Sequence, residues 1–302
     1  MNNVVEFFFF RLLGFAATTL PYRWASRLGS TLGSLSFHVI RIRRRVTLEN
    51  LQHAFPGRTE GERKQIAAGA YRNFGIVFLQ MLWASSATDD ELRDVVRIDD
   101  RTVLDRILAA ESGFILLSGH FGGWEFIVHG LRLHIGKPFS IIVQRQRNPY
   151  VDRFIDRIRS RHGNRTVTKG MTRDALLTLR SGGILAMLAD QSAPKESMFL
   201  DFFGRPAATH RGVAAFALKT GCPILFSALI RQADGSYKGV FEEVSREGLS
   251  EGSEEAIGEL TRRHVTLLEE LIRKYPDQWL WMHKRWKHKV HSPDNAVAAI
   301  AE

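Results

Sequence analysis

Apolar residues in this chain follow two patterns, short runs that are wholly or mostly apolar and positions repeated at helical spacing. The runs are typical of strands buried on both faces of a sheet, and they cover residues 114–117, 139–143, 184–189 and 224–230. Helical spacing predicts a long helix after Thr59 and further helices over residues 101–110, 151–158, 172–180, 213–219 and 254–275. Together these patterns predict an α/β fold with a central, mostly parallel or mixed sheet flanked by helices.

Several connections are predicted from local residue types. Thr59 and Glu62 match a capping box at the start of the long helix. Residues 237–242 are expected to pair with the run that ends at residue 230, around a turn at Asp234 and Gly235. We expect residues 92–98 to form a strand or a short link, and residues 199–204 to form an aromatic loop.

The first 45 residues are predicted to associate with a membrane. The apolar stretch 4–17 is short for a spanning helix and is interrupted by Glu6 and Arg11, which favours a helix in one leaflet. A single span and a buried core helix are the alternatives. Residues 22–45 continue with apolar residues at helical spacing and end in a cluster of arginines at 41, 43, 44 and 45. Such a cluster suits anionic headgroups, although a solvated helix end is the simpler alternative.

Charge narrows the choice of partners. The 302 residues carry a net charge of +10, which favours anionic membranes, an acidic carrier protein, phosphorylated lipids or nucleic acid. With a single cysteine, Cys222, the chain has no internal disulfide. The amino terminus has no basic region before its apolar run, so we expect no cleaved signal peptide.

The strongest candidate for chemistry lies where the run 114–117 ends. His120 stands at that point, and ligands of open α/β sheets collect outside the carboxyl ends of strands. Gly122 and Gly123 permit a tight turn that can fold Glu125 back onto His120. A carboxylate on one ring nitrogen would prepare the other to accept a proton from a hydroxyl. Free backbone N–H groups where the next helix starts could hold an oxyanion or a phosphate.

Other chemistries fit less well. The chain has no Gly-x-Ser-x-Gly, and Cys222 is far from His120 in sequence, so direct attack by a substrate hydroxyl is favoured. Glu125 and His129 are four residues apart but lack the His-Glu-x-x-His arrangement, so no metal is predicted. A histidine and a glutamate at this spacing also occur by chance with no catalytic role.

The sequence Leu-Leu-Ser-Gly-His120-Phe-Gly-Gly-Trp-Glu125 resembles the His-x4-Asp/Glu motif of glycerolipid-type (lysophospholipid) acyltransferases. Its Glu form is similar to the bacterial lipid A late acyltransferases, which transfer lauroyl and myristoyl groups. Further blocks agree in order, and they cover residues 43–51, 54–56, 189–191, 202–204, 207–209 and 281–287. The resemblance extends over about residues 20 to 290.

This resemblance implies an O-acyltransferase with a glycerolipid acyltransferase-like fold, no metal and no redox cofactor. The donor would be an acyl thioester, with acyl carrier protein favoured over CoA, and the acceptor a hydroxyl of a lipid A precursor or related glycolipid. An acyl-CoA-dependent enzyme acting on another phospholipid or glycolipid is the alternative. We expect residues 1–45 to meet the cytoplasmic face of the inner membrane, 46–291 to form the acyltransferase domain and 292–302 to form a flexible tail.

Further site residues are expected beyond the dyad. Arginines are concentrated between residues 145 and 165, where guanidinium groups could grip phosphate in a fork geometry. Arg145 and Arg159 match arginines of the family and are candidates for phosphate or transition-state charge, with a surface ion pair as the alternative. The resemblance also implies a substrate site at Asp190 and Gln191. The Asp190 carboxylate could orient His120 or an arginine, or it could cap the following segment.

A different class of function is suggested by residues 279–289, which interleave tryptophans with cations. Such a patch could stack on nucleic-acid bases or sit at a membrane interface. A basic membrane- or nucleic-acid-binding protein without catalysis is therefore the non-enzymatic alternative. It gives no reason for a His–Glu pair beside glycines at the end of a strand, so we expect no nucleic-acid partner.

Overall fold

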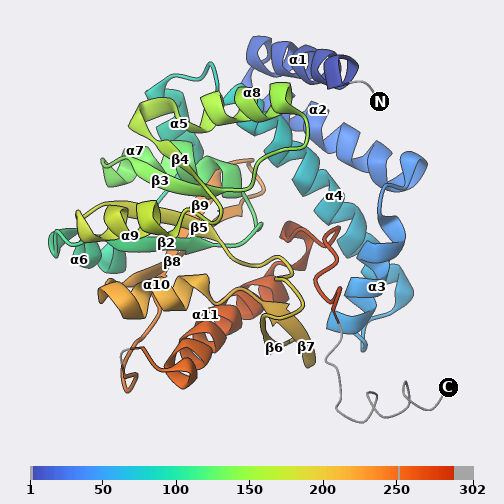
Figure 1. Cartoon of the computed structure of the whole chain (residues 1–302). Coiled ribbons are helices and arrows are strands. Elements are labelled where there is room, and N and C mark those ends of the chain that lie inside the picture. The colour runs from blue at the N-terminus through green and yellow to red at the C-terminus, as the bar shows by residue number, and fades with distance from the viewer. Residues whose placement is uncertain (1–2, 251, 289–302) are drawn as a thin grey trace.

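A seven-stranded mixed sheet forms the centre of the computed structural model, which describes residues 3–250 and 252–288 (Figure 1). The strand order is β1-β9-β8-β2-β5-β3-β4. Strands β4, β3, β5, β2 and β8 run parallel, whereas β9 is antiparallel to β8 and parallel to β1. The strands are β1 (Val96–Arg97), β2 (Phe114–Ser118), β3 (Phe139–Val143), β4 (Arg165–Thr168), β5 (Ile184–Leu188), β8 (Ile224–Arg231) and β9 (Tyr237–Glu243). The predicted sheet is confirmed.

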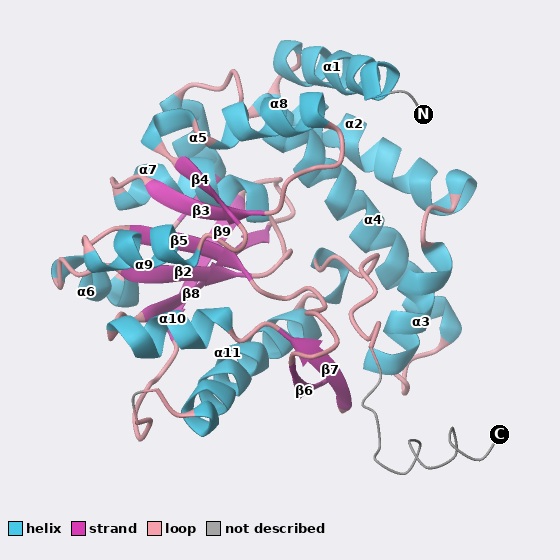
Figure 2. Cartoon of the chain, viewed as in Figure 1, coloured by secondary structure: helices cyan, strands magenta, loops and turns pink. Residues whose placement is uncertain are grey.

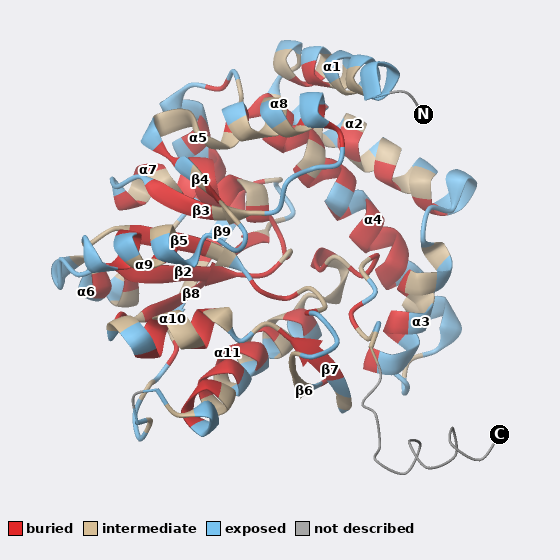
Figure 3. Ribbon diagram, viewed as in Figure 1, coloured by how far each residue is buried: buried red, intermediate tan, exposed pale blue. Residues whose placement is uncertain are grey.

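Helices cover both faces of this sheet (Figure 2). They are α1 (Asn3–Thr19), α2 (Tyr22–Leu35), α3 (Arg44–Ala54), α4 (Glu60–Trp83), α5 (Asp89–Val95), α6 (Thr102–Ala109), α7 (Arg132–Ile135), α8 (Pro149–Arg159), α9 (Thr172–Arg180), α10 (Gly212–Thr220) and α11 (Glu254–Lys274). Successive side chains of β2 enter opposite layers: Ile115 and Leu117 join one apolar cluster, and Phe114 and Leu116 the other. This is why β2 is apolar throughout and buried along its length (Figure 3).

The register of β2 and β5 positions two of the predicted site residues. Ser118, the last residue of β2, lies opposite Leu188, the last residue of β5. His120 and Asp190 each follow two residues later, and parallel neighbours end at the same edge of a sheet. Two residues that are 70 positions apart in sequence therefore emerge side by side.

Two helices pack closely through glycines. Gly29 and Gly33 of α2 face the backbone of α4, and a Cβ atom on either would collide with it. A Cβ atom on Gly75 of α4 would likewise collide with the backbone of Gly29. At the start of α4, the Thr59 backbone N–H donates to Glu62 Oε2 at 2.7 Å, and the Glu62 N–H donates to Thr59 Oγ1 at 3.2 Å. The predicted capping box is confirmed.

Two local predictions are wrong at least in part. Residues 89–95 form helix α5, with a capping box between Thr88 and Glu91, and β1 that follows has only two residues. The expected aromatic loop is a hairpin of β6 (Met198–Phe202) and β7 (Arg205–Thr209). Its turn places Phe203 and Gly204 at positive φ, 57° and 73°, which suits a tight hairpin.

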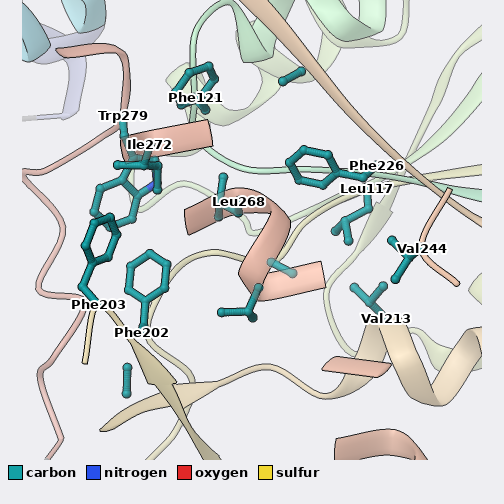
Figure 4. Packing of buried hydrophobic residues seen from close by; sticks show 14 of the residues in the cluster. Leu117, Phe121, Phe202, Phe203, Val213, Phe226, Val244, Leu268, Ile272 and Trp279 are labelled. Carbon is teal, nitrogen blue, oxygen red and sulfur yellow. The ribbon is translucent and has the colours of Figure 1, made fainter. Parts of the chain in front are cut away.

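The patch of tryptophans and cations predicted over residues 279–289 is wrong for two of its tryptophans and for Arg285, although Lys284 and Lys287 are exposed. Trp279 is 2% exposed, Trp281 is 0% exposed and Arg285 is 2% exposed. Figure 4 shows Trp279 near Phe203, within the apolar cluster that also includes Leu268 of α11. These residues therefore build the interior, and the main support for a nucleic-acid-binding surface is removed.

The amino-terminal helices lie at the surface (Figure 1). Phe10 of α1 packs against Phe78 of α4 and Phe154 of α8, with both pairs of ring centroids 5.5 Å apart. Other residues of α1 remain exposed, including Phe8 at 64% and Phe15 at 68%. Across residues 3–250 and 252–288, no helix has both the length and the apolar character that crossing a membrane requires. The predicted flexible tail, residues 292–302, lies outside the described residues.

Candidate active site

A cavity of about 510 Å³ opens at the carboxyl edge of the parallel strands, where His120 lies. Polar and charged residues contribute part of its lining, namely His120, Glu125, Gln144, Arg145, Gln146, Arg159, Lys169, Gln191 and His210. Apolar residues contribute the rest, including Leu116, Ile127, Val128, Ile141 and Ala186. The structure therefore brings five of the six predicted site residues to one cavity, and the sixth, Asp190, lies directly behind His120.

His120 is held by Asp190. The ring Nδ1 lies 2.7 Å from Asp190 Oδ1, and the His120 backbone N–H donates to Asp190 Oδ2 at 2.7 Å. Trp279 Nε1 also donates to Oδ2, at 2.8 Å. A carboxylate acceptor keeps the proton of the neutral ring on Nδ1, which leaves Nε2 free to accept a proton. Gln191 Nε2 lies 3.4 Å from this Nε2.

The electrostatics of the pair favour a charged carboxylate. Burial favours the neutral acid, but the charge and hydrogen bonds of His120 lower the pKa of Asp190 to about 2. Burial also opposes the charged form of the His120 ring, yet Asp190 outweighs this and raises the pKa of His120 above its ordinary value. The site is therefore arranged to stabilise an imidazolium when the ring takes up a proton.

Glu125 binds Arg159 rather than the ring of His120. Arg159 donates through Nη2 to Oε1 at 2.5 Å and through Nε to Oε2 at 3.1 Å, a bidentate pair between partly buried side chains. Burial raises the pKa of the carboxyl, but Arg159 more than compensates, so the pKa of Glu125 is lowered. The hydrogen bond that we expected the His120 ring to donate to Glu125 is donated to Asp190 instead. Glu125 remains near enough for its charge to raise the pKa of His120.

Arg145 lies at the outer part of the cavity. Its Nη1 is 2.9 Å from Asp152 Oδ2, and its side chain is largely exposed. It therefore forms the ion pair that the sequence left open as an alternative, while still lining the cavity.

The loop after His120 is fixed by backbone contacts. Gly122 has φ +55°, and a Cβ there would collide with the carbonyl of Leu229. The Gly122 N–H donates to Gln278 O at 2.9 Å, and the Gly123 N–H donates to Leu229 O at 2.8 Å. These two N–H groups already have partners, so neither is free to bind an anion. The glycines instead set the path of the chain from His120 to Glu125.

Comparison with known proteins identifies the family. The family model described as "Bacterial lipid A biosynthesis acyltransferase" matches residues 3–288. The chain belongs to this family. Its members are O-acyltransferases, and the protein is an enzyme of that class.

Curated relatives of this acyltransferase are distant in sequence but similar in extent. The lipid A biosynthesis palmitoleoyltransferase of Escherichia coli (strain K12) is 23% identical over 270 residues, covering 89% of this chain and 86% of that protein. A lipid A biosynthesis acyltransferase of Haemophilus influenzae is 25% identical over 281 residues, covering 91% and 84%. The lipid A biosynthesis lauroyltransferase of E. coli is 23% identical over 275 residues, covering 89% and 87%.

The sequence did not reveal how the carboxyl-terminal segment supports the acyltransferase site. Besides the bond from Trp279 to Asp190, the Leu280 N–H donates to His120 O at 3.1 Å. Ser192, just after Gln191, donates its backbone N–H to His283 Nε2 at 2.9 Å. One signal was available, because a carboxylate buried behind His120 needs hydrogen-bond donors, and an indole N–H can only donate.

Proposed function

We propose that this acyltransferase moves a fatty acyl group from an acyl thioester to a hydroxyl of a lipid A precursor or a related glycolipid, with His120 as the general base. The observation that carries the proposal is the ring of His120, which lines the cavity with Nδ1 bound to the buried Asp190, while Nε2 has only a long contact of 3.4 Å, with Gln191 Nε2. This is the arrangement that proton abstraction from a hydroxyl requires. The names of the relatives support the glycolipid acceptor.

The proposed reaction needs one base that later acts as an acid. The acceptor hydroxyl gives its proton to His120 Nε2 while its oxygen attacks the thioester carbonyl. The tetrahedral intermediate then collapses, the carbon–sulfur bond breaks, and the imidazolium returns the proton to the leaving thiolate. Asp190 stabilises the imidazolium throughout by its charge and its hydrogen bond to Nδ1.

Glu125 and Arg159 complete the proposed catalytic set. The bidentate pair fixes the Arg159 guanidinium at the cavity wall. A fixed cation there can stabilise the oxyanion of the intermediate or a substrate phosphate. We therefore keep His120 and Glu125 together as the catalytic dyad of the motif, with Glu125 acting through Arg159 and through its charge. Arg145, Asp190 and Gln191 are proposed to bind or orient the substrates.

The proposed donor is acyl carrier protein, with acyl-CoA as the alternative. The net charge of +10 suits an acidic carrier protein, and both donors carry a thioester on a phosphopantetheine arm. The apolar part of the cavity wall, which includes Ile127, Val128 and Ile141, suits the acyl chain.

The proposed location is the cytoplasmic face of the inner membrane. Helix α1 exposes aromatic residues, and arginines gather where the segment that includes α2 ends, at positions 41, 43, 44 and 45. Apolar side chains beside cations suit the surface of an anionic bilayer, where a glycolipid acceptor would reside.

Replacement of the proposed base tests this function. With a labelled acyl carrier protein thioester and a lipid A precursor, His120→Ala should lose at least about a hundredfold in kcat, since a positioned base contributes that much or more. The exposed His38 outside the cavity provides the control, and His38→Ala should retain activity. Acyl transfer at the normal rate by a folded His120→Ala protein, as judged by circular dichroism, would falsify the proposed mechanism.

A further inference from the structure

Lys169 and His210 form a second polar cluster on the cavity wall, apart from the groups assigned above. Lys169 follows β4 and is exposed, whereas His210 follows β7 and is half-buried. Their side chains meet, with Lys169 Nζ 3.3 Å from His210 Nε2. An ammonium group has no lone pair, so Lys169 donates and a neutral His210 accepts.

Among the described residues that line the cavity, Lys169 is a cation without a carboxylate partner. Arg159 is paired with Glu125, and Arg145 is paired with Asp152. Among the residues that the structure describes, no carboxylate forms an ion pair with Lys169. A cation that faces a cavity without a counter-charge is suited to an anionic part of a ligand.

Two helix starts lie beside this cluster, and the start of a helix carries partial positive charge, the same sign as Lys169. Helices α9 and α10, of nine residues each, both begin at the cavity, where Thr172 and Gly212 line its wall. Neither helix has a side-chain hydrogen bond at its N-cap, Met171 or Arg211. Helix α10 also has no acidic residue in its first turn, so the partial positive charge of its start adds to the charge of Lys169, whereas Asp174 in the first turn of α9 reduces the charge at the start of that helix.

The protonation of His210 responds to the same environment. Burial and the neighbouring Lys169 lower the pKa of His210 to about 4, so the ring is neutral near pH 7. A neutral imidazole beside an ammonium can turn one N–H toward an incoming anion while Lys169 supplies the charge.

We propose that Lys169 and His210 form a binding site for a phosphate group of one of the two substrates. That phosphate is either a phosphate monoester on the glycolipid acceptor or the phosphodiester of the phosphopantetheine arm on the donor. The proposal rests on the proposed function in one respect, since both substrates must enter this cavity to react. It differs from the roles of Arg145 and Arg159, whose guanidinium groups are already paired with carboxylates.

Kinetics of Lys169→Ala test the site. We expect the KM of the phosphate-bearing substrate to rise about tenfold, with a smaller change in kcat, because a charged contact to the substrate is lost. Lys169→Arg should recover most of the affinity, and His210→Phe should weaken binding in the same direction. Lys137, exposed in the turn before β3 at the opposite edge of the sheet, is the matched control, and Lys137→Ala should leave both KM values unchanged.

Substrates with and without phosphate identify which of the two substrates supplies the phosphate that binds at Lys169 and His210. One arm compares a phosphorylated glycolipid acceptor with the same acceptor after phosphatase treatment. The other compares an acyl carrier protein thioester with an acyl N-acetylcysteamine thioester, which has no phosphate. A penalty from Lys169→Ala confined to the phosphorylated member of either pair supports the site and names the substrate. No penalty in either pair, or an equal penalty with and without phosphate, overturns it.

Binding to an inactive protein separates this proposal from the catalytic one. Affinities of the phosphorylated acceptor and of the acyl carrier protein thioester are measured for His120→Ala and for His120→Ala/Lys169→Ala. Weaker binding by the double variant supports the phosphate site whatever the turnover. Equal binding by both proteins rejects the site and leaves the assignment of His120 as base untouched.

Discussion

At the residue scale, the site contains two carboxylates with different neighbours. Asp190 is almost fully buried and receives hydrogen bonds from the His120 backbone, the His120 ring and Trp279. Glu125 receives two from Arg159. We therefore expect Asp190 to control the protonation of His120 and Glu125 to control the position of Arg159.

The pH dependence of Asp190→Asn tests this division. A base works when neutral, so kcat/KM should rise with pH through the pKa of His120. Asp190 raises that pKa, so removal of its charge should lower it and move the rising limb to lower pH. The maximal rate should also fall by about 10² to 10⁴, because the imidazolium loses its stabilising partner.

Glu125→Gln is the comparison for that experiment. Glu125→Gln should move the rising limb of the pH profile of kcat/KM less than Asp190→Asn does, because Glu125 raises the pKa of His120 less than Asp190 does. Its main cost should be in kcat, since the amide no longer neutralises and holds Arg159. A larger shift of the limb from Glu125→Gln than from Asp190→Asn would contradict the division of roles.

At the element scale, the contact of α2 with α4 depends on the absence of side chains. Gly29, Gly33 and Gly75 allow two helix backbones to touch, and a methyl group on any of them has no room. Helix α4 contains a glycine with no room for a Cβ atom and another with room for one. Gly75 lies at the contact, whereas Gly61 lies in the first turn, where an added Cβ would meet nothing closer than Thr59 Oγ1 at 3.9 Å.

Alanine at these two glycines should therefore have different effects on stability. Gly75→Ala should lower the free energy of unfolding by about 1 to 3 kcal/mol, because the helices must move apart. Gly61→Ala should be neutral or should raise it by up to about 1 kcal/mol, because alanine favours the helix. Urea unfolding followed by circular dichroism measures both, and equal effects would mean that the close contact of α2 and α4 does not exist in solution.

At the scale of the whole molecule, tryptophans near the carboxyl end of the described chain are buried, whereas several apolar residues near the amino end are exposed. The carboxyl-terminal tryptophans Trp279 and Trp281 enter the core, and the indole N–H of Trp279 donates to Asp190 behind His120. The amino-terminal helix α1 packs one side against α4 and α8 and leaves Phe8, Leu12 and Phe15 exposed. This exposed set recurs at helical spacing, so it presents one apolar face, as a membrane-docking helix does.

Binding to lipid vesicles tests that face. Replacement of Phe8, Leu12 and Phe15 by serine should weaken sedimentation with phosphatidylglycerol-containing vesicles by about tenfold or more, because buried apolar area drives interfacial binding. Leu177 of α9 is also exposed, and Leu177→Ser is the control that should bind normally. Unchanged vesicle binding by the triple variant would show that α1 is not the docking element.

The sequence by itself determined the features that depend on neighbours along the chain. Residues 139–143 were predicted as a strand and form β3 with the same limits, because a short run that is apolar apart from Ser140 suits a strand buried on both faces. The capping box at Thr59 and the position of His120 just beyond β2 followed from equally local signals. Local residue types were sufficient wherever local hydrogen bonds and periodic burial decide the conformation.

Tertiary structure alone decided which side chains meet. Glu125 was the nearest carboxylate in sequence, yet parallel pairing of β2 with β5 gives Asp190 the bond to His120, across 70 residues. Trp279 and Arg285 lie in an irregular segment, and without a period nothing showed that both are buried. Periodicity shows which side of an element is apolar, but the partner of a buried polar group is set by strand order and packing between distant segments.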